Sequence, residues 1–108
     1  MVIRKHPRFS VSLSSTLVHK NRFSHAGSVR NLSAKGCHVV SIISPFTGMQ
    51  LTVQLHVPGE PKPIVITNAA VRWSGSAGIG LEFLTVAPPH QDRLDRMIQK
   101  LQPKTNPQ

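Results

Sequence analysis

Hydrophobic and polar residues alternate with a period of two along about the first four-fifths of the chain, and this alternation predicts β-strands. In FSVSLSS, at 9–15, apolar side chains point to one face and serines to the other. Similar patterns predict further strands at 27–33, 37–43, 50–57, 64–73 and 79–84. The alternation in 64–73 shifts near Asn68, which predicts a β-bulge.

Near the C-terminus the spacing of apolar residues changes to that of an α-helix. The residues at i, i+3, i+4 and i+7 are Leu94, Met97, Ile98 and Leu101. The cations expected on the opposite face are Arg93, Arg96 and Lys100. Because residues with this spacing share one face of a helix, we predict a helix over residues 89–102.

Together these elements predict an all-β fold, a small antiparallel β-barrel of six or seven strands with a C-terminal α-helix. The turn segments PGEPKP at 58–63 and GSAG at 75–78 separate strands. A chain of 108 residues suits one domain with its own core. We assign residues 1–102 to that domain, with the barrel over residues 9–86, and expect a disordered tail at 103–108.

The charge balance is strongly positive, since 13 Lys and Arg face four acids and give a formal net charge of +9. Such a field attracts polyanions, whether nucleic acid, nucleotide or anionic lipid, without selecting one of them. Aromatic residues make up 5% of the chain, too few for the stacking platform of a single-strand-binding protein. Charge therefore permits nucleic-acid binding, whereas composition argues against it.

Cysteine content and hydropathy favour a cytoplasmic protein. Cys37 is the single cysteine, so no disulfide can form within the chain. The basic N-terminal segment is not followed by the apolar run of a signal peptide. No segment approaches the roughly 20 apolar residues of a transmembrane helix, so we expect no membrane insertion.

Two arginines, Arg4 and Arg8, stand four positions apart in the segment RKHPR. Pro7 disfavours the helical conformation of His6, so pairing on a helix surface does not explain the spacing. In an extended segment the two residues span roughly 13 Å, about the breadth of a dinucleotide. We expect residues 1–8 to form an arm that is flexible in the absence of a ligand.

A second polar segment, NLSAKG, lies between the second and third predicted strands. Asn31 and Ser33 are two positions apart, so their side chains point the same way on an extended chain. Gly36 provides a positive φ or allows a close approach of backbone. On its own, the segment is typical of a turn.

With both segments in this order, the chain resembles the PilZ domain family, bacterial receptor domains for cyclic di-GMP. The family pattern is RxxxR, a strand, and then [D/N]xSxxG, which matches Arg4, Arg8, Asn31, Ser33 and Gly36. GMQLTVQLHVPG, VRW, GIGLEF and the closing helix also stand where the family has counterparts. The resemblance covers nearly the whole chain and implies a PilZ-type β-barrel.

The resemblance implies that these five residues bind cyclic di-GMP. An Arg guanidinium can fork onto phosphate oxygens or onto the O6/N7 edge of guanine, and its flat face can stack on a base. Asn31 and Ser33 would bond to a guanine edge and its ribose-phosphate, and Gly36 would leave room for the base. Asn31 stands where the family also admits Asp, so its bond to guanine would be neutral rather than charge-assisted.

Four further residues are possible secondary contacts. Lys5 and Arg30 could add general attraction for an anion, although a solvated surface position is the simpler interpretation of each. His6 is more simply a spacer than a contact. Trp73, the single tryptophan, is expected in the core, with base stacking as the alternative. Since Ile3 precedes Arg4 where another arginine could have stacked, we favour one bound nucleotide over an intercalated pair.

Metal binding and catalysis find little support in the sequence. The six histidines show no paired metal spacing, and the adjacent Cys37 and His38 face opposite sides of a strand. The four acids, Glu60, Glu82, Asp92 and Asp95, are scattered, and no nucleophile has an evident base and orienting group. We therefore expect no enzyme activity, no metal and no cofactor.

The leading hypothesis is a cyclic di-GMP receptor whose arginine arm orders on the nucleotide. The resulting surface would signal to a protein partner that controls motility, secretion or exopolysaccharide production. Two alternatives remain: a PilZ-like protein–protein adaptor without nucleotide binding, and a basic β-barrel that binds nucleic acid.

Overall fold

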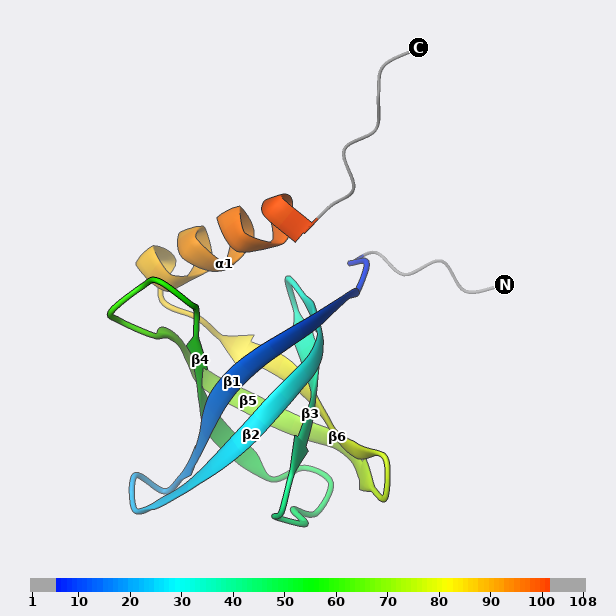
Figure 1. The fold of residues 1–108 in the computed structure, drawn as a ribbon. Helices are drawn as coiled ribbons and strands as arrows, with labels where there is room; N and C mark the ends of the chain where they lie inside the picture. Colours follow the sequence, from blue (N-terminus) through cyan, green and yellow to red (C-terminus); the bar gives the residue numbers. More distant parts are fainter. Residues whose placement is uncertain (1–5, 102–108) are drawn as a thin grey trace.

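Six antiparallel strands form a closed barrel in the computed structural model, which describes residues 6–101 (Figure 1). The strands are β1 (Phe9–His19), β2 (Phe23–Ser33), β3 (Gly36–Ser41), β4 (Gln50–His56), β5 (Ile64–Gly75) and β6 (Gly78–Thr85). Their order around the barrel is β1-β2-β3-β6-β5-β4, and pairing of β1 with β4 closes it. The all-β barrel with a C-terminal helix is confirmed, with six strands.

All six sequence-predicted strands are present, but the first two are longer than the alternation indicated. β1 continues to His19 and β2 begins at Phe23, so the two strands meet at a short turn. Lys20 and Asn21 in this turn both have φ near 55°, and the N–H of Arg22 donates to the carbonyl of His19 at 3.1 Å. Asn adopts this left-handed conformation more readily than most L-residues, but Lys does not. The dipeptide Lys20-Asn21 is therefore not a typical hairpin-turn sequence, and the sequence alone did not predict the tight hairpin.

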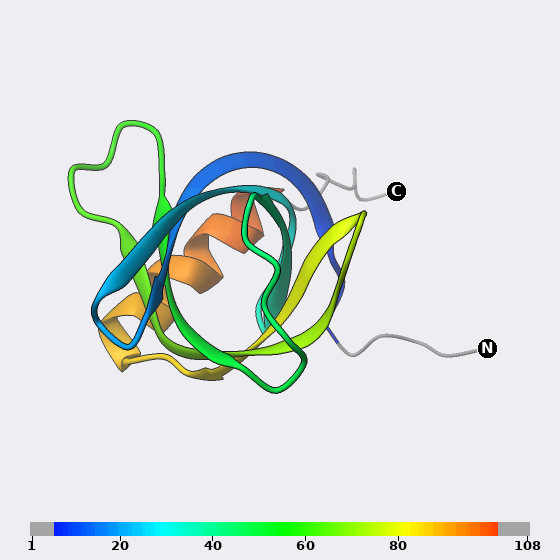
Figure 2. The same ribbon diagram turned by 90° about the horizontal axis from the view of Figure 1, so that it is seen from below.

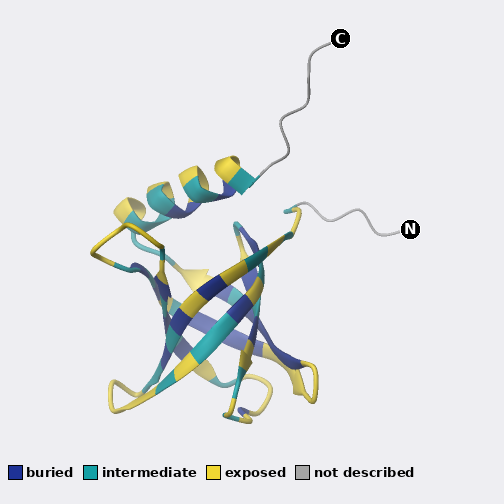
Figure 3. Ribbon diagram, viewed as in Figure 1, coloured by how far each residue is buried: buried dark blue, intermediate teal, exposed yellow. Residues whose placement is uncertain are grey.

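The barrel interior is filled by aliphatic side chains from every strand, and buried and exposed positions alternate along the strands (Figure 3). The largest fully buried side chains include Leu17, Leu32, Leu55, Ile66 and Leu81. The expected irregularity of β5 near Asn68 is confirmed, since the pairing with β6 shifts between Asn68 and Ala69. A second shift in the same strand pair lies between Val71 and Trp73.

The helix α1 (Pro88–Leu101) lies across one end of the barrel (Figures 1 and 2). It begins and ends within one residue of the predicted helix. The predicted apolar face is confirmed: Leu94 and Ile98 are buried, and Met97 and Leu101 are partly buried against the same core. The helix therefore closes the hydrophobic interior that the strands leave open at this end.

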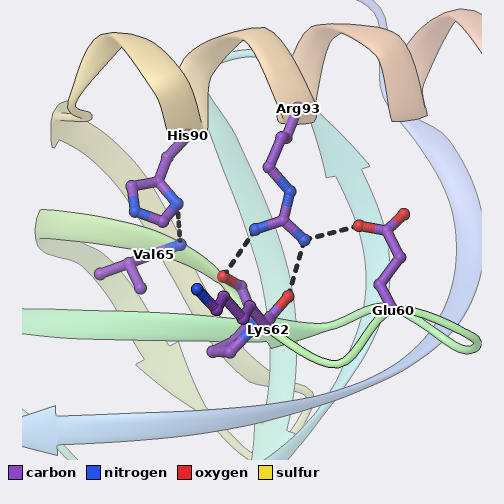
Figure 4. Close-up of polar contacts among 6 residues, drawn as sticks. Glu60, Lys62, Val65, His90 and Arg93 are labelled. Atoms are coloured by element: carbon purple, nitrogen blue, oxygen red, sulfur yellow. Dashed lines mark hydrogen bonds and ion pairs between the residues drawn. The ribbon is translucent and has the colours of Figure 1, made fainter.

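One predicted solvent-facing cation of α1, Arg93, instead ties the helix to the β4–β5 loop (Figure 4). Its guanidinium donates to the carbonyls of Pro63, at 2.9 Å, and Lys62, at 2.6 Å, and pairs with Glu60. Nearby, Nδ1 of His90 accepts a hydrogen bond from the N–H of Val65 at 3.1 Å. These contacts fix the position of α1 over the barrel end.

Parts of the predicted domain layout fall outside the described residues. Positions 1–5 of the arginine arm and the tail at 103–108 are not described, so their proposed roles stay predictions. Within residues 6–101, no helix is long and apolar enough to cross a membrane.

Candidate ligand-binding site

A surface hollow of about 360 Å³ lies where the start of β1 approaches the β2–β3 turn and strands β5 and β6. Arg8, Ser33 and Lys35 line it from the first half of the chain. The second half contributes Arg72, Trp73 and Glu82, together with the backbone around Gly80. The hollow thus gathers three cations and one carboxylate from four separate segments.

Arg8 connects the two motifs that the sequence singled out. It stands directly before β1, and its Nη1 donates a hydrogen bond to Oδ1 of Asn31 on β2 at 3.1 Å. The antiparallel register of β1 and β2, which pairs Phe9 with Leu32, brings the two segments together. Asn31 does not itself line the hollow; it holds the guanidinium that does.

Ser33 sits at the end of β2 with its hydroxyl inside the β2–β3 turn. Its Oγ donates to the carbonyl of Gly36 at 3.3 Å and accepts a hydrogen bond from the N–H of Lys35 at 3.2 Å. Ser33 is nearly fully buried, whereas Asn31 is partly exposed. In this state Ser33 therefore shapes the wall of the hollow, and its hydroxyl is already engaged with the backbone.

Gly36 is required by a close approach of backbone rather than by a positive φ. A methyl group at this position would lie 2.5 Å from the carbonyl oxygen of Leu81 on β6 and 3.6 Å from Nη2 of Arg8. No side chain fits at the shorter distance without displacing a strand. The glycine thus lets β3 lie against β6 directly below the guanidinium.

Arg72 and Glu82 form an ion pair across neighbouring strands at the edge of the hollow. Both side chains are about half exposed, so the pair is screened by water and contributes little to stability. Its effect on the site is electrostatic, because Arg72 compensates the one carboxylate that faces the hollow. The remaining cations, Arg8 and Lys35, leave the site positive.

The expectation that Trp73 belongs to the core is wrong. Trp73 is 42% exposed and lies on the outer face of the barrel against Gly80, where a methyl group would meet its indole at 2.0 Å. The cause is the bulge after Val71, which turns both Arg72 and Trp73 outward where strict alternation would have buried the indole. The alternative, an aromatic wall of the ligand site, becomes the better interpretation.

His38 supports the indole from β3. The two rings are tilted with their centroids 5.2 Å apart, and Nε2 of His38 donates to the carbonyl of Ala77 at 2.6 Å. This contact links the wall of the hollow to the β5–β6 turn. Trp73 is thereby packed between a histidine ring and the backbone of Gly80.

The other candidates differ in where they lie. His6 lines the hollow beside Arg8, so its position permits a contact. Arg30 is exposed on β2 and is not among the lining residues, which agrees with a solvated position. Arg4 and Lys5 lie outside the described residues.

Sequence reasoning missed Lys35, Arg72 and Glu82 as parts of the site. Lys35 was inside the NLSAKG motif, at a position the family pattern leaves open. The pairing of Arg72 with Glu82 depends on the bulge and on the strand order around the barrel, and neither can be read from local alternation. Of these three residues, only Lys35 could have been predicted from the sequence, because it lies between the motif residues Ser33 and Gly36.

Cys37 lies beneath the site in the core. Burial raises the pKa of its thiol to about 12, against a smaller lowering by the positive charge of Arg8. The thiol is therefore protonated near neutral pH and packs as a small apolar group. Its side chain points into the barrel, whereas His38 points outward, as their adjacency on a strand predicted.

Among residues 6–101, no three His, Cys, Asp or Glu side chains are grouped closely enough to hold a metal ion. The polar groups of the hollow are mainly cationic donors. These donors suit an anion that carries hydrogen-bond acceptors. The exposed indole of Trp73, which also lines the hollow, suits a flat ring.

The chain is thus a small closed β-barrel domain with one helix over its end and a basic hollow on its side. The model of the PilZ domain family matches residues 3–100, and the chain belongs to this family. A comparison with curated proteins found no match.

Solved structures with the same fold share little sequence with this chain. The PilZ domain of YcgR from Escherichia coli, solved with c-di-GMP, has a TM-score of 0.71 at 16% identity, covering 93% of this chain and 92% of that one. The inhibitor of motility MotI/DgrA of Bacillus subtilis gives 0.69 at 22% identity and 94% coverage of this chain. This match spans 55% of the Bacillus protein, so the chain corresponds to about half of it.

A third similar structure is MrkH, described as a c-di-GMP-dependent transcription regulatory factor, with a TM-score of 0.67 at 17% identity. The match covers 92% of this chain and 51% of MrkH. At these identities the neighbours establish the fold of this chain.

Proposed function

We propose that this PilZ domain is a receptor for cyclic di-GMP, which binds in the hollow lined by Arg8 and Trp73. The observation that carries the proposal is the hydrogen bond between Arg8 and Asn31, which unites the two motif segments at the edge of a basic hollow. Ser33 of the second motif lines the adjoining wall, and Gly36 lets β3 approach β6 close to Arg8.

The chemistry of the hollow suits a dinucleotide with two phosphates and two guanines. Arg8 and Lys35 offer donors for phosphate oxygens, and a guanidinium can also fork onto the O6/N7 edge of guanine. The half-exposed indole of Trp73 offers a face for a purine. Asn31, once Arg8 turns toward the ligand, has a free amide for the guanine edge.

The similar proteins support the same ligand. The YcgR domain is described with c-di-GMP, and MrkH is described as dependent on it. Both have the fold of this chain, and the range matched by the family model includes the segments that carry Arg8, Asn31 and Gly36. Since Ile3 precedes Arg4 where another arginine could have stacked on a second nucleotide, we propose that one nucleotide is bound.

Arg4 is proposed as the second guanidinium of the site. It precedes Arg8 by four positions, and an extended segment of that length spans roughly 13 Å, enough to reach a different part of the same ligand. We propose that the arm orders as both arginines engage the nucleotide. Because residues 1–5 lie outside the described part, this step is based on the sequence.

The proposed output is a protein contact rather than a reaction. The surface formed by protein and nucleotide would be recognised in the cytoplasm by a partner that controls motility, secretion or exopolysaccharide production. The Bacillus neighbour, named as an inhibitor of motility, supports the first of these processes. No catalytic role is proposed for any residue.

Calorimetric titration with cyclic di-GMP tests the proposal. We expect saturable binding to the native chain and none to an Arg4→Ala, Arg8→Ala variant that keeps the far-UV circular dichroism of the parent. At a ligand concentration of about 100 times Kd, the nucleotide should stabilise the fold by about 2.7 kcal/mol. This corresponds to a rise in Tm on the order of 10 °C. A native chain that gives neither heat nor a change in Tm overturns the proposal.

A further inference from the structure

The barrel end opposite α1 carries an apolar groove between two loops. The β1–β2 turn and the β3–β4 loop both lie at this end, drawn lowest in Figure 1. Between them is a groove of about 370 Å³ whose apolar lining includes Phe23, Ile43, Phe46, Met49 and Leu51. We call this surface the distal groove.

The distal groove continues into a second hollow. That neighbouring hollow, of about 480 Å³, shares Phe46, Met49 and Leu51 with it and extends toward Lys20 and Thr52. The combined surface shares no lining residue with the hollow at Arg8. Both surfaces can therefore be occupied at the same time.

Two aromatic side chains at the groove are exposed in the isolated chain. Phe23 is 52% exposed and Phe46 is 72% exposed, although the core of the barrel is otherwise well covered. Large apolar side chains grouped beside a concavity are typical of protein interfaces, where a few buried aromatic residues supply most of the binding energy. A partner that covered both rings would remove this apolar area from water.

The charge around the distal groove has one sign. Lys20 and Arg22 stand in the β1–β2 turn, and the guanidinium of Arg22 lies 5.7 Å from the centroid of the Phe23 ring. The four acids are elsewhere: Glu60 pairs with Arg93, Glu82 with Arg72, and Asp92 and Asp95 are on α1. The complement of this surface is therefore an apolar segment that carries carboxylates.

The shape favours a peptide segment over a bilayer. A lipid surface accepts projecting side chains, whereas the distal groove is a concavity that needs a side chain to fill it. Two cations would each add only about 1 kcal/mol at an anionic membrane, where stable attachment uses clusters of roughly four to eight. A second copy is also a poor match, because two of the four acids are paired with arginines and the other two are on α1, which also carries three cations.

We propose that the distal groove docks an acidic, amphipathic segment of a partner protein. Apolar anchors of the segment fill the groove between Phe23 and Phe46, and its carboxylates pair with Lys20 and Arg22. This inference goes beyond the proposed receptor function and does not depend on nucleotide binding, since it rests on a separate surface.

Selection from a random peptide display library against the full chain tests the inference. We expect a consensus of Leu or aromatic anchors flanked by Asp or Glu. A synthetic peptide with that consensus should perturb the amide signals of Phe23, Phe46, Met49 and Leu51. Its affinity should fall about tenfold or more in Phe46→Ser, the loss typical of a central anchor. Lys20→Glu, Arg22→Glu should weaken binding and remove most of its salt dependence.

Matched controls separate this surface from other exposed residues. Leu84→Ser removes an exposed apolar side chain outside the distal groove, and Arg30→Glu reverses a cation on β2. Both should leave peptide affinity unchanged. Phe46→Ser should retain cyclic di-GMP binding. Peptide binding therefore tests the distal groove, and nucleotide binding tests the receptor proposal independently of it.

Three outcomes overturn the inference. One is a selection that yields no acidic consensus, or peptides whose binding ignores Phe46→Ser. Another is binding to vesicles of phosphatidylcholine and phosphatidylserine that Phe46→Ser abolishes, which would assign the groove to a membrane. The last is self-association in sedimentation velocity that the same substitution abolishes, which would assign it to a second copy.

Discussion

The guanidinium of Arg8 donates a hydrogen bond to the side-chain oxygen of Asn31 at 3.1 Å, across 23 positions of sequence. The contact joins the arginine segment to the polar segment that ends β2. Because a ligand would have to share or replace this bond, the two residues define where recognition by the proposed receptor begins.

Replacing Arg8 by alanine should weaken cyclic di-GMP binding by roughly ten- to a hundredfold, the effect of losing one charge-assisted contact. Calorimetric titration measures the change. Arg30→Ala removes an equally charged side chain on β2 that does not line the hollow, so it should bind within about twofold of the parent. Equal losses in the two variants would show that net charge, rather than the hollow, drives binding.

Asn31→Asp should strengthen nucleotide binding by about fivefold. A carboxylate makes a charge-assisted bond to the N–H groups of guanine, roughly twice as strong as the neutral bond of an amide. Titration of parent and variant side by side gives the ratio. Weaker binding in the variant would mean that Asn31 faces a phosphate of the ligand, or that it contacts Arg8 and not the ligand.

Gly36→Ala should destabilise the barrel by about 1–3 kcal/mol, because the added methyl group would lie 2.5 Å from the carbonyl oxygen of Leu81. Denaturant unfolding measures the loss. Gly75→Ala is the matched control, since nothing lies within 4 Å of a methyl group there. A Gly36→Ala chain as stable as the Gly75→Ala chain would contradict the close approach of β3 and β6.

Arg93→Ala should lower the free energy of unfolding by about 1–2 kcal/mol, because α1 loses its bonds to Pro63, Lys62 and Glu60. The corresponding fall in Tm is about 5 °C or more. Arg96→Ala changes an exposed cation on the same helix and should have little effect. If the two variants melt together, the contacts in Figure 4 do not hold the helix.

Cys37 should make stability depend on alkaline pH. Its folded-state pKa of about 12 lies above the ordinary 9.0, so only the unfolded chain releases this proton between those values. The contribution is complete below pH 9.0 and is lost as pH rises toward 12, by up to about 1.4 kcal/mol per pH unit. Denaturant unfolding across this range should show a shrinking stability difference between the parent and Cys37→Ala. A constant difference would contradict the buried, protonated thiol.

The sequence by itself determined the local elements and the family. Alternation at period two located six strands because each strand has one face in the barrel and one in water. The spacing of Leu94 and Ile98 located the helix, and the two polar segments identified the motif residues. Each of these signals is carried by residues close together in the chain.

Only the tertiary structure decided how distant residues meet. A bulge after Val71 placed Trp73 on the surface, and the strand order placed it at the hollow that Arg8 also lines. Arg93 was expected in water, but the fold brought the β4–β5 loop within its reach. Closure of the barrel sets these relationships, since register and strand neighbours depend on pairing across the whole chain, which local periodicity does not encode.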